Sequence, residues 1–220
     1  MDGDRPALRR GARAAAVGTP LVFLAVFFAW PLAAILERSL VEDGGLDFPF
    51  DVLASRETLD VAWFTLWQAT ASTALTLAAG LPLTWALARF SFPGRRLAEA
   101  LVLIPFVLPT VVVATAFLAV LPDALEGTAW AILLAHVFFN VAVVVYVVGA
   151  FWRQLDGRAW DVASTLGAGP ARRFQAVTVP LLQPALAAAA AIVFLFSFTS
   201  FGVVLILGGP GYATLEAEIY

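Results

Sequence analysis

The chain has 220 residues, of which 61% are hydrophobic and 13% charged, and its mean hydropathy is +0.90. A soluble domain of this length carries roughly twice that charged fraction, so the composition indicates an integral membrane protein. There is no cysteine, which excludes disulfides and thiolate metal sites. All 13 basic residues are arginine, so the lysine of a Walker-type ATPase is missing, and the single histidine excludes a two-histidine zinc motif. The net charge of −3 is too small to indicate a partner.

Five apolar stretches are long enough to cross a bilayer, which requires about 20 mostly apolar residues. We expect spans at residues 17–36, 61–87, 97–121, 128–152 and 177–207. The predicted fold class is therefore all-α, a polytopic bundle of transmembrane helices. The first stretch is too long for a signal peptide, and ILERSL follows it where small cleavage-site residues would stand. A retained helix is therefore favoured over a cleaved leader.

Arginines are concentrated in alternate connectors between these spans. By the positive-inside rule, such connectors are cytoplasmic. The sequence thus predicts a cytoplasmic arm (1–16), a first span with an acidic extracytoplasmic loop (17–60) and a core (61–220). Five spans leave the C-terminus outside, and we expect a sixth helix after Tyr220. Eleven of the 13 arginines follow the pattern: Arg5, Arg9, Arg10, Arg13, Arg89, Arg95, Arg96, Arg153, Arg158, Arg172 and Arg173.

A polar segment, DVASTLGAGPARRFQAVTVPLL, interrupts the apolar chain at residues 161–182. Asp156 or Asp161 suits the start of a short helix. Gly167 and Gly169 are expected to end that helix with positive φ, and Pro170 suits the first turn of a second short helix. Pro180 and Pro184 then mark the start of the last span, so the segment is predicted to form a helix–turn–helix. From the residues alone, an amphipathic loop with its arginines at lipid headgroups and a docking surface remain equal alternatives.

The spacing of this segment resembles the signature loop of ABC importer permeases, E-A-A-x3-G-x9-I-x-L-P. Residues 161–163 stand at the acid-Ala-Ala positions, with Val162 the one departure that is not conservative. Gly167 follows after three residues, and V-x-V-P after nine more. The resemblance implies that contact with an ATPase is made by Asp161, Ala163, Gly167, Ala168, Val177 and Pro180.

The family resemblance also implies a fold and a set of partners. The fold would be that of a type I ABC importer permease, with a cytoplasmic coupling loop at 153–176. The partners would be a cytoplasmic ABC ATPase dimer, an extracytoplasmic solute-binding protein, a second permease half (fused or separate) and the lipid of a bacterial inner membrane. ATP would be hydrolysed on the ATPase, so this chain is expected to be a transport subunit without a cofactor, not an enzyme. Nucleic acid is not an expected partner.

Further stretches resemble the same family and cover about residues 60–220. They are TLTLAAGLPLTWALARFSFPGRR, LIPFVLPTVVVATAFLAV, AILLAHVFFN and LILGGPGYATLEAEIY. The last two look most like the subgroup that imports thiamine or ferric iron. Permeases for sulfate, molybdate and polyamines share the scaffold, and these solutes remain alternatives.

Polar residues inside spans are candidates for a translocation path, because they are costly in a membrane. His136 and Asn140 are four residues apart and share a helical face. Ser197, Thr199 and Ser200 lie in SFTSFG of the last span. The alternative is that these residues only bond neighbouring helices or allow close packing.

Three other classes compete with an ATP-driven permease. An ion-coupled secondary transporter typically needs ionisable groups within its spans, and only His136 is available. A membrane hydrolase would need paired acids, a metal cluster or a GxSxG motif, and the sequence has none of these. A structural subunit is disfavoured only by the resemblance of the polar segment to a coupling loop.

Overall fold

The computed structural model describes residues 16–41, 55–155 and 158–219. The four arginines of the N-terminal arm, most of the predicted acidic loop and the candidate cap Asp156 lie outside these residues. The chain divides into two compact units, Met1–Leu53 and Ala54–Tyr220, each of which is described by itself.

The first unit contains one membrane-length helix, Ala16–Arg38. It includes a π-helical turn, η1 (Ala25–Ala29), and continues as α2 (Trp30–Val41). Its large apolar side chains are exposed, Trp30 by 76%. A helix that is apolar on all sides suits a lipid environment, in agreement with the first expected span.

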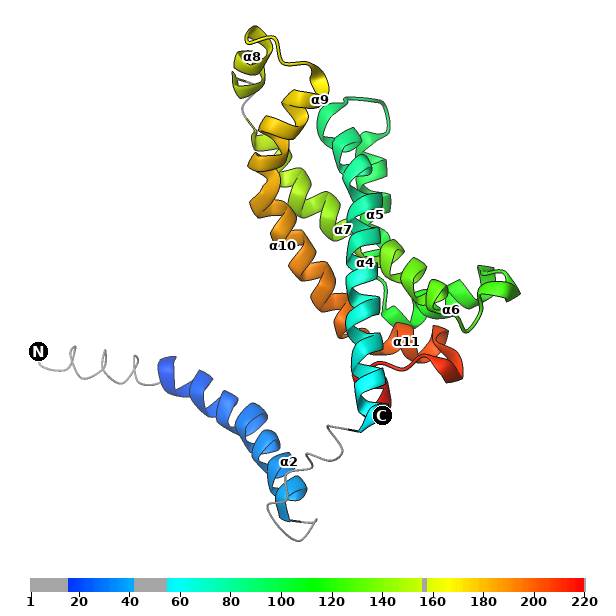
Figure 1. Cartoon of the computed structure of the whole chain (residues 1–220). Helices are drawn as coiled ribbons and strands as arrows, with labels where there is room; N and C mark the ends of the chain where they lie inside the picture. Colours follow the sequence, from blue (N-terminus) through cyan, green and yellow to red (C-terminus); the bar gives the residue numbers. More distant parts are fainter. Residues whose placement is uncertain (1–15, 42–54, 156–157, 220) are drawn as a thin grey trace, which may run out of the picture. The chain divides into compact units, whose positions relative to one another are not determined.

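The second unit is built around three long helices that lie side by side (Figure 1). They are α4 (Arg56–Arg89), α7 (Ala129–Gln154) and α10 (Val179–Phe198). Ser55 caps α4, because its Oγ accepts a hydrogen bond of 3.2 Å from the amide of Thr58. Buried valines of α7, including Val144 and Val148, form the core together with Leu182 and Val193 of α10. The expected second and fourth spans are thus confirmed.

The third expected span, 97–121, is present as two helices joined at a sharp bend. α5 (Arg95–Val107) and α6 (Thr110–Val120) meet at an angle of 104°. The cause is Pro109, which disfavours the helical conformation for the residue before it. Leu108 is accordingly extended, with φ −71° and ψ 145°.

The fifth expected span, 177–207, was wrong in its bounds. A single helix runs from Pro170 to Phe198, made of α9 (Pro170–Arg173), the π-helical turn η3 (Phe174–Thr178) and α10. The chain then leaves the helical conformation at Thr199 and Ser200, and α11 (Phe201–Leu207) follows. The described residues therefore hold four membrane-length helices, or five spans if α5 and α6 count as one.

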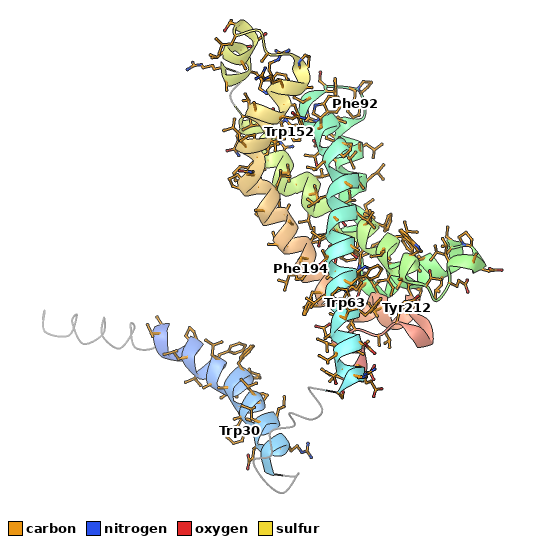
Figure 2. The ribbon with its side chains drawn as sticks, viewed as in Figure 1. Trp30, Trp63, Phe92, Trp152, Phe194 and Tyr212 are labelled. Atoms are coloured by element: carbon orange, nitrogen blue, oxygen red, sulfur yellow. The ribbon has the colours of Figure 1, made fainter. Side chains whose placement is uncertain are left out.

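The two ends of the second unit carry different connectors (Figure 1). One end holds the turn between α4 and α5 together with α8 (Arg158–Thr165), and the opposite end holds α11 and α12 (Leu215–Ile219). Two short 3₁₀ turns are η2 (Asp123–Leu125) and η4 (Gly209–Gly211). Trp152 lies toward the first end, whereas Trp63 and Tyr212 lie toward the second (Figure 2). The elements of the described residues are all helical, which confirms the predicted fold class.

Candidate functional site

A cluster of polar side chains joins the three long helices inside the bundle. Ser72 Oγ of α4 lies 2.9 Å from His136 Nδ1 of α7. Gln68 of α4 donates from Nε2 to the backbone carbonyl of Ser197, at 2.8 Å. Asn140 of α7 donates to the Ser197 hydroxyl at 3.4 Å. His136 and Asn140 therefore bond neighbouring helices and not each other.

Three polar atoms of this cluster keep an unused hydrogen-bonding capacity. Gln68 Oε1, His136 Nε2 and Asn140 Oδ1 are buried and have no hydrogen-bond partner among the described residues. A buried polar atom without a partner costs about 1–3 kcal/mol. Such atoms are expected at a site where a solute or water supplies the missing partner.

A cavity of about 430 Å³ lies beside this cluster, at the two interruptions of the helices. Of the five predicted path residues, His136, Asn140, Thr199 and Ser200 line it, whereas Ser197 is fully buried and is not part of the lining. Its other lining residues include Phe106, Phe139, Phe196, Phe201, Thr110 and Gly202. The described lining residues are thus neutral, with aromatic rings and a few polar groups.

The two interrupted helices approach each other at the cavity. A Cβ built on Gly202, at the start of α11, would lie 3.0 Å from Thr110 Oγ1, at the start of α6. Irregular backbone at membrane depth is tolerated where it is buried in protein or lines a water-filled cavity. The sequence contained one signal for this arrangement, the Leu108–Pro109 pair, and none for the second interruption.

The turn after α8 has the geometry of a Schellman motif. The amide of Ala168 donates to the carbonyl of Ala163, and the amide of Gly167 to that of Ser164, both at 3.0 Å. Gly167 has φ +78°, as predicted. Gly169 instead has φ −66°, so the prediction of positive φ was wrong there; it precedes Pro170 at the start of the next helix. Asp161 lies in the first turn of α8 and is exposed.

Val177 and Pro180 do not belong to this turn. Both lie on the helix Pro170–Phe198, so the predicted second short helix is the first part of a span. The ring of Pro180 would clash with the carbonyl four residues earlier in a regular α-helix. The π-helical turn at Phe174–Thr178 avoids this clash, and the amide of Val179 donates to the carbonyl of Phe174.

The exposed surface of α8 and its turn carries two apolar side chains. Val162 is 59% exposed and Leu166 is 81% exposed, and they lie four residues apart. The sequence pattern pointed to Gly167, and Leu166 was not among the predicted contact residues. An apolar residue four places from another on a polar segment is the signal that would have found it.

Trp160 connects α8 to the ends of two spans. Its Nε1 donates to Thr178 Oγ1 at 2.7 Å. The guanidinium carbons of Arg89 and Arg173 each lie 5.1 Å from the centroid of its ring. Arg173, for which lipid or ATPase contacts were predicted, thus contacts the indole. The sequence alone gave no indication that these four residues meet.

Known proteins show which family has this arrangement. A family model described as "Binding-protein-dependent transport system inner membrane component" matches residues 78–220. The thiamine transport system permease protein ThiP of Brucella abortus is 34% identical over 92% of this chain, which spans 40% of that relative. The sulfate permease CysT of Salmonella typhimurium is 30% identical, with 88% of this chain and 74% of the relative covered. The putative 2-aminoethylphosphonate permease PhnU of the same organism is 30% identical, with 91% and 78% covered.

Solved structures support the fold. A bacterial ABC transporter involved in the import of the acidic polysaccharide alginate matches with a TM-score of 0.74 at 14% identity, covering 94% of this chain and 80% of that one. A complex of the alginate transporter with a periplasmic protein matches with a TM-score of 0.71 at 14% identity. At this identity the match concerns the fold. Together with the family model, these relatives show that the chain is a multi-pass member of the family of inner-membrane permease components of binding-protein-dependent ABC importers.

Proposed function

We propose that this chain passes thiamine from an extracytoplasmic solute-binding protein into the cytoplasm, driven by a separate cytoplasmic ABC ATPase dimer. A second permease half, fused or separate, completes the path. The ATPase binds and hydrolyses ATP, and this chain carries no cofactor. The family and the thiamine relative support this proposal.

The observation that carries the proposal is the cavity at the two helix interruptions. Its volume of about 430 Å³ lies within the range of about 300–1,000 Å³ that is usual for small-molecule sites. Two of the three unpartnered polar atoms, His136 Nε2 and Asn140 Oδ1, belong to residues that line it. Both atoms are themselves buried, so in this proposal a movement of the two side chains on solute entry brings them into hydrogen-bonding distance of the solute.

The chemistry of the lining favours thiamine over the other solutes. Thiamine joins a cationic thiazolium ring to an aminopyrimidine that donates and accepts hydrogen bonds. Phenylalanine faces attract cations and stack with rings, and four phenylalanines line the cavity. Sulfate, molybdate or a phosphonate is bound most strongly where cationic side chains add to backbone amides, whereas ferric iron or a polyamine is usually bound by carboxylates. The described lining residues supply neither kind of group.

The coupling site in this proposal is α8 with the turn at Gly167. Leu166 and Val162 present exposed apolar surface beyond the spans, on a rigid turn. We infer from the arginine distribution that this end faces the cytoplasm. A groove on the ATPase would receive these side chains, with Asp161 available to a basic partner.

The test uses the transporter assembled with its second permease half, its ATPase and its binding protein in liposomes. We expect ATP-dependent uptake of radiolabelled thiamine that vanadate abolishes and an uncoupler leaves intact. Radiolabelled sulfate should not be taken up. Uptake that collapses with the uncoupler would favour an ion-coupled secondary transporter, and uptake of sulfate alone would overturn the choice of solute.

A substitution at Gly167 tests the coupling site. Gly167→Trp should insert into the membrane normally and abolish ATP-driven uptake, because it strains the positive φ and fills the docking surface. Gly18→Trp is the control, since nothing lies within 4 Å of a Cβ at that glycine. Uptake at the wild-type rate by the Gly167 variant would show that the turn is not a docking surface.

A further inference from the structure

We infer that Trp160 is the positioning residue that fixes the coupling helix to the spans, so that a displacement of α8 moves the end of α4 and the helix Pro170–Phe198 together. This inference rests on the proposed function, because it concerns how ATP-driven motion reaches the spans. It adds a mechanical role for a residue outside the signature pattern.

The helix α8 needs such an attachment. It has eight residues, and none of them is fully buried. Isolated helices shorter than about 12–15 residues are marginal in water, so most of their stability comes from tertiary contacts. The Schellman turn joins α8 to α9 but does not by itself fix the angle between them.

Trp160 supplies contacts in three directions from one side chain. Its indole N–H donates to the hydroxyl of Thr178, which is only 1% exposed and lies in the π-helical turn. Arg89 reaches the ring from the last turn of α4, and Arg173 reaches it from α9. A guanidinium within about 6 Å of an aromatic ring is attracted to its face. Trp160 is therefore bound to both spans that end beside α8.

The indole borders a small cavity and a larger one, and the larger, lined also by Pro170, Leu182 and Leu186, measures about 600 Å³. The small cavity between Trp160, Thr178 and the neighbouring rings of Trp85, Trp152 and Phe174 measures about 30 Å³. Trp152 and Phe174 have ring centroids 6.3 Å apart, which links α7 to the same group. The hydrogen bond to Thr178 and the two arginine contacts, and not close packing on every side, therefore transmit the displacement.

An ordinary interfacial tryptophan is the alternative. Tryptophans are enriched at membrane interfaces, where their N–H groups face the headgroups. Here the N–H is engaged by a buried hydroxyl on another helix segment, and two arginines contact the ring. These contacts are between helices and do not depend on lipid.

The first test measures coupling in the complete transporter. Trp160→Ala should still co-purify with the ATPase and hydrolyse ATP, but thiamine moved per ATP should fall about tenfold, because one hydrogen bond and two cation–π contacts are lost. Trp160→Phe keeps a ring for the arginines and should recover most of the ratio. Trp130→Ala, a 58% exposed tryptophan at the start of α7, is the control. An unchanged ratio in Trp160→Ala would overturn the inference.

The second test needs neither solute nor ATPase. Because the chain has no cysteine, spin labels can be placed at Ser91→Cys beside the end of α4 and Ser164→Cys on α8, both exposed. Trp160→Ala should broaden the distance distribution between the labels, and Trp160→Phe should narrow it again. An unchanged distribution in the Ala variant overturns the attachment. A wild-type transporter that moves no thiamine, but whose labels respond in this way, would overturn the proposed solute and leave the attachment standing.

Discussion

At the scale of single residues, Gly80 determines how closely α4 and α7 pack. A Cβ at this position would lie 2.8 Å from both Cβ and Cγ1 of Val144, which is fully buried. Real Cβ contacts are not this short, so an added methyl group must displace the valine or separate the helices. Small residues at such crossings are typical of membrane helix pairs.

Gly80→Ala should therefore destabilise the bundle by about 1–3 kcal/mol, the usual cost of overpacking. The thermal midpoint in detergent, followed by intrinsic fluorescence, measures this loss. In a double-mutant cycle, Val144→Ala should reduce the cost of Gly80→Ala in part, since it removes Cγ1 and Cγ2 and leaves only the Cβ of residue 144 in the way. Gly18→Ala is the control, because nothing lies within 4 Å of its Cβ. Additive costs in the cycle would contradict the steric explanation.

The residues of the cavity were partly predictable from the sequence. His136 and Asn140 are polar residues in an apolar helix, and their chemistry alone made them candidates. Gln68 and Ser72 were equally visible, because Thr65, Gln68, Ser72 and Thr76 are spaced by three or four residues along one face of α4. Trp160 was not predictable, since its partners come from segments about 70 residues before it and 13 to 18 residues after it.

At the scale of elements, the local sequence predicts one of the two helix interruptions and not the other. The interruption at Leu108 follows from the chemistry of Pro109. The interruption at Thr199 and Ser200 contains neither proline nor glycine. It depends on tertiary contact, because the Ser197 carbonyl near the end of α10 is satisfied by Gln68 from α4. A local sequence pattern cannot reveal this partner, because Gln68 and Ser197 are 129 residues apart in the chain.

Replacing Gln68 tests this contact. Gln68→Leu removes the donor to the Ser197 carbonyl and should lower the free energy of unfolding by about 1 kcal/mol, which the thermal midpoint would report. Thr70→Val is the matched control on α4, because the exposed Thr70 hydroxyl only bonds the Leu66 carbonyl of its own helix. Equal midpoints for the two variants would mean that Gln68 does not support the end of α10.

At the scale of the whole second unit, the structure places both basic connectors at one end. Arg89 precedes the α4–α5 turn and Arg173 follows α8, yet both contact Trp160. The two basic connectors are separated by two crossings of the membrane, so the positive-inside rule requires them to lie on the same side. The number of spans was also close to correct, because length and hydropathy are sufficient to identify a membrane helix. Hydropathy does not report backbone conformation, so of the two interruptions only the one before Pro109 had a signal in the sequence.

The orientation of this unit can be measured with single cysteines, because the native chain has none. Ser164→Cys on α8 should react with a membrane-impermeant maleimide only after the inner membrane is permeabilised. Asp123→Cys in η2 should react in intact spheroplasts, since its connector is predicted to face outward. The reverse pattern would place α8 outside and would remove the basis of the coupling proposal.

The continuous helix from Pro170 to Phe198 has a further consequence. Its 29 residues span about 44 Å at 1.5 Å per residue, which exceeds the hydrocarbon thickness of about 30 Å. A helix of this length must tilt in the bilayer or extend beyond the hydrocarbon, so its α9 end, which contacts Trp160, can lie in the headgroup region while Phe198 stays within the membrane.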